Sequence, residues 1–233
     1  MSTLIDYMGC YLFPKSERKI TNNLVLGASL GGHAAWGCIL HEPRITSATI
    51  IVGCPDYINL MTDRAERSKL ATWASSSPAG FHFLGSESFP QPLVDTLKNW
   101  DPTSFFLSHI SEYPPKEPKR NGPIPDPTEE EKNILRPVVK RCLAGKKILV
   151  LSGGADKLVP YARGEPFLTW LKKAIGPEGW CAEGKISLED IIFEGVGHQV
   201  TSAMRDEAVR FIGDCLAAGQ DSSKSAVVRT SKM

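Results

Sequence analysis

The sequence lacks the features that mark membrane-inserted, secreted and nucleic-acid-binding chains. Its 27 basic and 26 acidic side chains leave a formal net charge of +1, which argues against a protein that binds nucleic acid through phosphate contacts. No apolar run reaches the roughly 18 residues that a membrane-spanning helix needs. The N-terminus has no basic stretch followed by an apolar one, so we expect the chain not to be secreted.

The six cysteines also lack the pattern of a metal or redox site. They include no C-x-x-C pair, and no histidine stands at zinc-ligand spacing from them. We expect reduced cysteines that act as small hydrophobic residues, and neither a metal nor another cofactor. The six are Cys10, Cys38, Cys54, Cys142, Cys181 and Cys215.

Alternating strand and helix patterns are present. Hydrophobic residues make up 42% of the chain, enough for a globular core. Four apolar runs rich in β-branched residues predict buried strands, and helical patterns at 30–41 and 204–216 follow the first and the fourth. This order predicts an α/β fold, a mostly parallel sheet flanked by helices. The predicted strands are residues 23–26, 48–52, 147–151 and 191–194.

About ninety residues between the second and third predicted strands do not fit this alternation. They contain a charged helical pattern at 61–73 and another at 129–143. Because an unstructured loop of this length is unusual in a compact domain, we interpret 57–145 as an inserted cap lobe over the edge where the strands end. The core is then 1–56 and 146–218, and we expect disorder in the polar tail 219–233.

The first predicted strand runs into Gly27-Ala28-Ser29-Leu30-Gly31 and then a helix. G-x-S-x-G in this context places a serine at a strained turn, with its hydroxyl projecting from the sheet edge. We expect small residues at both flanks, Gly27 and Gly31, because strand and helix close together there. The amide of Leu30 would face a developing oxyanion. The alternative is a Gly-rich turn without chemistry, which the strand-turn-helix context disfavours.

A nucleophilic serine needs a base, and the base needs an orienting acid. Asp156 follows the third predicted strand and His198 the fourth, so a parallel sheet brings both to the edge that carries Ser29. Asp56, after the second strand, is the rival acid, and we favour Asp156 for its loop and its place in chain order. His33, one helical turn after Ser29, either lines the pocket or packs against its own helix.

Three motifs resemble the α/β-hydrolase superfamily, over roughly residues 20–215. Residues 27–32 resemble its nucleophile elbow, 154–160 its acid loop, and Gly197-His198 its histidine loop. The middle lobe stands in the position of the superfamily's variable cap. Within the superfamily, the sequence resembles small intracellular esterase-type members of fungal origin, some of which serve secondary-metabolite pathways.

The resemblance implies a catalytic triad of Ser29 as nucleophile, His198 as general base and then acid, and Asp156 as the group that orients His198. It therefore predicts a serine hydrolase that cleaves an ester or thioester of a small to medium acyl compound. Two alternatives stay open. One is a lyase, isomerase or ring-closing enzyme that uses His198 for proton transfer, and the other is a catalytically weak or inactive binding module.

The sequence departs from the superfamily before the elbow. Only 28 residues precede Ser29, whereas the superfamily places several strands there, with a loop that supplies a second oxyanion donor. No His-Gly-Gly motif is present. We expect residues 1–19 to cover the exposed sheet edge only partly, which favours weak activity and self-association through that edge.

The final tripeptide, Ser231-Lys232-Met233, resembles the C-terminal peroxisomal address. It predicts recognition by a peroxisomal import receptor. If the match is due to chance, the expected location is the cytosol, and the sequence leaves both open.

Overall fold

The computed structural model describes residues 1–110, 119–120 and 122–230, with one four-stranded sheet among them. The neighbouring strands all pair in parallel, in the spatial order β1-β2-β3-β4. The predicted α/β fold with a parallel sheet flanked by helices is confirmed. The strands are β1 (Asn23–Ala28), β2 (Ile45–Ile51), β3 (Lys147–Gly153) and β4 (Ser187–Phe193).

The strand bounds differ from the predicted ones, most at β4. This strand begins at Ser187, four residues before the predicted start, and includes Glu189 and Asp190. It lies at the edge of the sheet, and its residues are half-buried or exposed. Polar residues are tolerated at an edge, so the continuous apolar pattern marks only the second half of β4.

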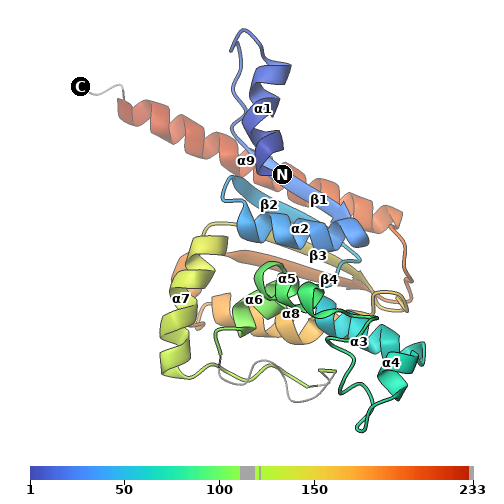
Figure 1. Ribbon diagram of the computed structural model, residues 1–233. Coiled ribbons are helices and arrows are strands. Elements are labelled where there is room, and N and C mark those ends of the chain that lie inside the picture. Colours follow the sequence, from blue (N-terminus) through green and yellow to red (C-terminus); the bar gives the residue numbers. More distant parts are fainter. Residues whose placement is uncertain (111–118, 121, 231–233) are drawn as a thin grey trace.

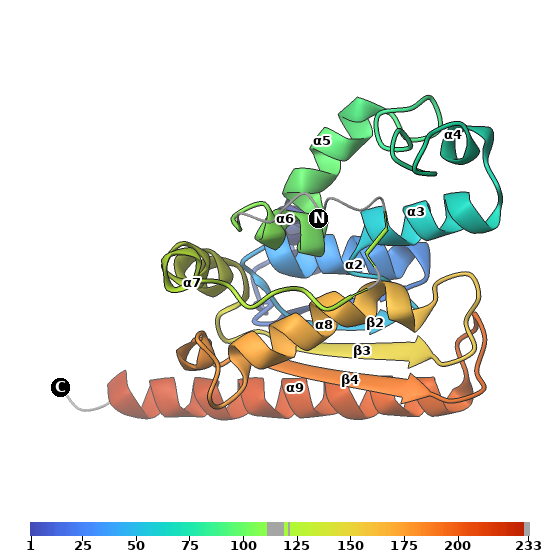
Figure 2. The ribbon, with the colours of Figure 1, turned by 90° about the horizontal axis from the view of Figure 1, so that it is seen from below.

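Helices cover both faces of the sheet, which explains the near-continuous apolar character of β2 and β3. In Figure 2, α9 (Ser202–Thr230) lies below the sheet, while α2 (Leu30–His41) and α8 (Tyr161–Ile175) lie above it. Leu149 and Leu151 of β3 point to α9, where they pack against Met204 and Phe211. The alternate residues join the larger cluster on the other face.

Helix α9 continues through residues 219–230, for which the sequence predicts disorder. Ala217 and Ala218 favour a helix and no proline follows them, so the helical backbone continues past Gly219. The last three residues, Ser231, Lys232 and Met233, lie outside the described residues, and the peroxisomal address stays a prediction.

The inserted segment 57–145 divides between two hydrophobic clusters. Its first part, α3 (Tyr57–Arg67), α4 (Ala71–Ala74) and α5 (Gln91–Trp100), surrounds a small cluster of its own. Its second part, α6 (Pro102–Leu107) and α7 (Glu129–Leu143), joins the main core beside α2. The buried side chains that α6 and α7 give to that core include Phe106, Leu107, Leu135 and Val139.

Local signals explain the ends of these helices. The charged pattern at 61–73 forms two helices, because Lys69 adopts a positive φ of 49° between α3 and α4. Helix α7 has the predicted bounds, and Thr128 forms a capping box with Glu131. None of the described helices combines the length and the apolar character required to cross a bilayer.

The β1 side of the sheet differs from the rest. Within the described residues, β1 pairs only with β2, and Leu26 is 54% exposed. Helix α1 (Ser2–Leu12) has no buried residue and projects from this side (Figure 1). A short 3-10 turn, η1 (Ala182–Gly184), precedes β4.

Candidate active site

Ser29 occupies a strained turn between β1 and α2. Its φ of 53° and ψ of −118° lie outside the regions that non-glycine residues usually adopt. Its amide donates to the carbonyl oxygen of Ile51 at 2.9 Å, which ties the turn to β2. This backbone geometry is that of a nucleophile elbow.

The crowding around the elbow falls on Gly27 and Gly32. A Cβ at Gly27 would lie 1.9 Å from the carbonyl oxygen of Gly31, and one at Gly32 would lie 2.9 Å from the Cα of Gly53. The expectation that Gly31 must be small is wrong, because a Cβ there would meet no atom within 4 Å. The close approach to β2 occurs one residue later on the helix.

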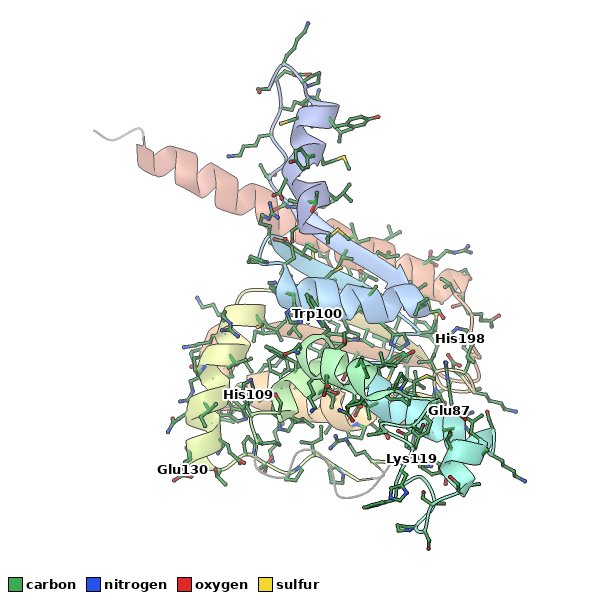
Figure 3. The ribbon with its side chains drawn as sticks, in the orientation of Figure 1. Glu87, Trp100, His109, Lys119, Glu130 and His198 are labelled. Atoms are coloured by element: carbon green, nitrogen blue, oxygen red, sulfur yellow. The ribbon has the colours of Figure 1, made fainter. Side chains whose placement is uncertain are left out.

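The structure brings Ser29, His198 and Asp156 together. Ser29 Oγ lies 2.8 Å from His198 Nε2, and His198 Nδ1 lies 2.8 Å from Asp156 Oδ2. A carboxylate only accepts hydrogen bonds, so Nδ1 donates to Asp156 and Nε2 of the neutral ring accepts from the Ser29 hydroxyl. Figure 3 shows His198 at the end of the sheet toward which the strands run.

Asp156 is held on both of its carboxylate oxygens. The side chain is buried, and Oδ1 accepts from the amides of Leu158 and Val159, both at 2.8 Å. Because Oδ1 is occupied by the loop itself, Oδ2 is directed at His198. The geometry is that of a base oriented by an acid.

The acid loop and the histidine loop pack directly on each other. The amide of Ala155 donates to the carbonyl oxygen of Val196 at 2.9 Å. A Cβ at Gly153 would lie 2.5 Å from that oxygen and 2.7 Å from the carbonyl oxygen of Gly197. Gly153 is therefore needed for the close contact that places His198, although sequence reasoning gave it no role.

Leu30 is the first residue of α2. Its amide therefore has no carbonyl partner within the helix and lies at the positive end of the helix dipole. The side chain is 75% exposed. The Leu30 amide is therefore a free helix-terminal donor next to Ser29 in the chain.

A cavity of about 610 Å³ begins beside Leu30 and follows one face of α2. The opposite wall comes from α5, where Leu93, Leu97 and Trp100 line the space. Figure 3 labels Trp100, which lies where α5 approaches α2. The α2 side chains that line the cavity are Leu30, His33, Ala34, Cys38 and His41, and Gly37 lies among them.

His33 both packs against its surroundings and lines this cavity. Its Nδ1 lies 2.8 Å from the carbonyl oxygen of Cys54, and its ring meets Tyr57 edge-on. Burial lowers the pKa of His33, so the neutral ring donates from Nδ1 to that carbonyl. Both of these partners lie outside the triad, and His33 is part of the cavity wall.

Asp56, the rival acid, does not reach His198. Its Oδ1 caps α3 by accepting from the amide of Asn59 at 3.0 Å, and its Oδ2 lies 3.4 Å from Nε of Arg120. Asp101 is buried beside it and accepts from the amides of Tyr57 and Ser104. Burial and the charge of Asp56 raise the pKa of Asp101 to about 8.

Sequence reasoning missed this second aspartate and the arginines of α3. Asp101 stands directly before Pro102, a helix-start signal that marks it as a cap. Arg64 and Arg67 contact the acid loop ninety or more positions along the chain, and no local pattern marks such pairs. Among the side chains that the structure describes, no cluster of three or more potential metal ligands occurs.

A scan against protein-family models finds no match, and a search of curated proteins finds no significant one. Solved structures are similar at low identity. SOBER1 of Arabidopsis thaliana is 12% identical, with 92% of this chain and 64% of that chain covered and a TM-score of 0.40. A puromycin-hydrolysing peptidase of Mycobacterium tuberculosis is 16% identical, with 82% and 21% covered and a TM-score of 0.43.

An esterase of Pyrococcus furiosus is 14% identical, with 89% of this chain and 57% of that chain covered and a TM-score of 0.41. The chain therefore spans less than two thirds of the length of each of these three proteins. At such values, a functional assignment has to come from the geometry of the chain's own residues.

Proposed function

We propose that the protein is a serine hydrolase that cleaves an ester or thioester of a small to medium, largely apolar acyl compound. The observation that carries the proposal is the hydrogen-bonded series from Ser29 through His198 to Asp156, with both links at 2.8 Å. The strained backbone of Ser29 supports the proposal, because residues with such strain cluster at active sites, where the surrounding structure holds them in place.

The reaction follows from these positions. His198 Nε2 takes the hydroxyl proton as Ser29 Oγ attacks the acyl carbon, and the Leu30 amide stabilises the oxyanion that forms. His198 then gives that proton to the leaving alcohol or thiol, which leaves an acyl group on Ser29. Water, deprotonated by His198, attacks the acyl-enzyme, and His198 returns that proton to Ser29 Oγ as the acid leaves. Asp156 holds the ring in the required tautomer throughout.

The cavity beside α2 supports an apolar substrate group. Its wall consists mainly of apolar side chains, and it runs from Leu30 to His41, a helix length of about 16 Å at a rise of 1.5 Å per residue. Gly37 contributes no side chain midway. We expect Gly37→Leu to reduce the turnover of longer acyl esters while the shortest ester keeps its rate. Equal losses across the series would place the acyl group elsewhere.

Because the sequence resembles esterase-type α/β-hydrolases that serve secondary-metabolite pathways, we also propose that the substrate comes from such a pathway. A panel of p-nitrophenyl and thioester substrates of increasing acyl length tests the reaction class without that assumption. Wild-type protein should hydrolyse members of the panel, and Ser29→Ala should remove the activity. Ser108→Ala, at an exposed serine of the lobe, is the matched control and should retain the activity.

The same variants separate the alternatives. Turnover that survives Ser29→Ala but is lost in His198→Ala would overturn the hydrolase proposal and point to proton-transfer chemistry. Unchanged ester hydrolysis in both variants would show that the triad is not the active centre.

A further inference from the structure

Two arginines of α3 contact the backbone of the acid loop. Arg64 donates to the carbonyl oxygen of Leu158 from both Nε, at 3.1 Å, and Nη2, at 2.7 Å. Arg67 donates from Nη1 to the carbonyl oxygen of Lys157 at 2.6 Å. The first helix of the inserted segment is therefore joined by three hydrogen bonds to the loop that carries Asp156.

These carbonyls belong to the two peptide groups that bind Asp156. The peptide group between Lys157 and Leu158 accepts from Arg67 at its oxygen, and its N–H donates to Asp156 Oδ1 at 2.8 Å. The next peptide group accepts from Arg64 at the oxygen of Leu158, and its N–H, on Val159, donates to the same Oδ1 at 2.8 Å. Each arginine is thus connected to the carboxylate through one peptide group.

We propose that Arg64 and Arg67 are positioning residues of the active site, which act on His198 through the acid loop and Asp156. This inference rests on the proposed hydrolase function. A cation at a peptide oxygen polarises the group and strengthens the hydrogen bond that its N–H donates. The two arginines therefore strengthen the bonds that occupy Oδ1 and leave Oδ2 directed at His198.

The arginines are themselves held in place. Helix α3 is capped by the buried Asp56 at the end of β2. Asp63, also buried, has Oδ2 2.7 Å from Nε of Arg67. The helix therefore joins the end of β2 to the loop after β3. A displacement of α3 from the acid loop would remove the support from Asp156.

The first test compares kcat and KM in Arg64→Gln. Glutamine keeps a polar side chain but loses the charge and the paired donors. We therefore expect kcat to fall about tenfold, the rate factor that corresponds to the loss of one charge-assisted hydrogen bond. KM should not change, because neither arginine lines the cavity. Arg64→Lys should recover part of the loss. Arg67→Gln, at a half-exposed side chain that makes one such bond, should lose less.

The matched control is Arg136→Gln. Arg136, on α7 of the same inserted segment, also donates from Nε to a backbone carbonyl, that of Trp180, at 2.8 Å. Its partners, Trp180, Asn133 and Glu183, lie outside the acid loop, so kcat should keep its wild-type value. An equal loss in Arg136→Gln and Arg64→Gln would show a general effect on folding and would overturn the proposal.

The second test is a double-mutant cycle read by the rate at which a fluorophosphonate probe labels Ser29. If Arg64 acts through Asp156, Arg64→Gln should slow labelling in the wild-type background and have little further effect in Asp156→Asn. The same tenfold loss in both backgrounds would contradict the proposal. Failure of the hydrolase assignment would appear differently, as wild-type protein that neither reacts with the probe nor hydrolyses esters.

Discussion

Asp56 and Asp156 occupy corresponding places in the fold but have different side-chain partners. Each follows a buried parallel strand, and each accepts from the amide three residues ahead, that of Asn59 at 3.0 Å and that of Val159 at 2.8 Å. The second oxygen of Asp156 binds His198, whereas that of Asp56 lies beside Arg120.

The order of the strands explains the difference. Asp156 follows β3, which pairs with β4, and the histidine loop begins where β4 ends. Asp56 follows β2, which has no contact with β4 within the sheet. Two aspartates that each accept from the amide three residues ahead therefore differ because only one lies beside the strand that leads to His198.

The largest expected effect separates the two aspartates by activity. Asp156→Asn should lower ester turnover by about 10⁴, because the amide favours the wrong tautomer of His198. Asp56→Asn should stay within a few-fold of the wild-type rate. Both rates are measured on one p-nitrophenyl ester at pH 7. Losses of similar size in the two variants would break the comparison and return Asp56 to the catalytic site.

A second pair of positions extends the comparison to the elbow. Gly32→Ala places a Cβ 2.9 Å from the Cα of Gly53, a backbone contact that has to shift, and should cost about 1–3 kcal/mol of unfolding free energy. Gly31→Ala meets open space and should be neutral or slightly stabilising, since alanine favours a helix. Urea unfolding of both variants measures the difference. Equal unfolding free energies of the two variants would show that the contact between Gly32 and Gly53 is not close enough to exclude a Cβ.

The third expected effect concerns pH and the buried pair of Asp56 and Asp101. The pKa of Asp101 is about 8 in the folded protein and about 4 in an unfolded chain. Between these values the folded state holds a proton that the unfolded state has lost, so stability falls as the pH rises from about 4 to 8.

The slope due to Asp101 reaches at most about 1.4 kcal/mol per pH unit. Asp101→Asn has no such proton, so its unfolding free energy should change less between pH 5 and pH 8 than that of the wild-type protein. Denaturant unfolding at the two pH values measures both slopes. The same pH dependence of the unfolding free energy in both proteins would mean that Asp101 is ionised throughout this pH range. The buried pair would then hold no proton on Asp101.

The parts of the molecule that were predictable are those with local signals. The elbow motif, the strand-then-helix alternation and the chain order identified Ser29, Asp156 and His198, because a parallel sheet carries the ends of its strands to one edge. The charged helical pattern at 129–143 predicted both ends of α7 to the residue. The elbow motif and this helical pattern each lie within one short segment of the sequence.

The parts that were missed depend on contacts between distant segments. Gly32 and Gly53 are crowded only because α2 and β2 approach each other, and Arg64 finds its carbonyl on another loop. The start of β4 was missed because edge strands tolerate polar residues. The cavity arises where α5 comes back over α2, and no short pattern in either helix encodes that approach.

We propose that His198, oriented by Asp156, activates Ser29, and labelling by a fluorophosphonate probe is the most direct experiment on this series. We predict that the probe modifies wild-type protein at Ser29, as located by peptide mass spectrometry, and fails to modify Ser29→Ala. It should modify Asp156→Asn far more slowly, while Asp56→Asn should react within a few-fold of the wild-type rate. Wild-type protein that does not react, or reaction at a serine other than Ser29, would contradict the account.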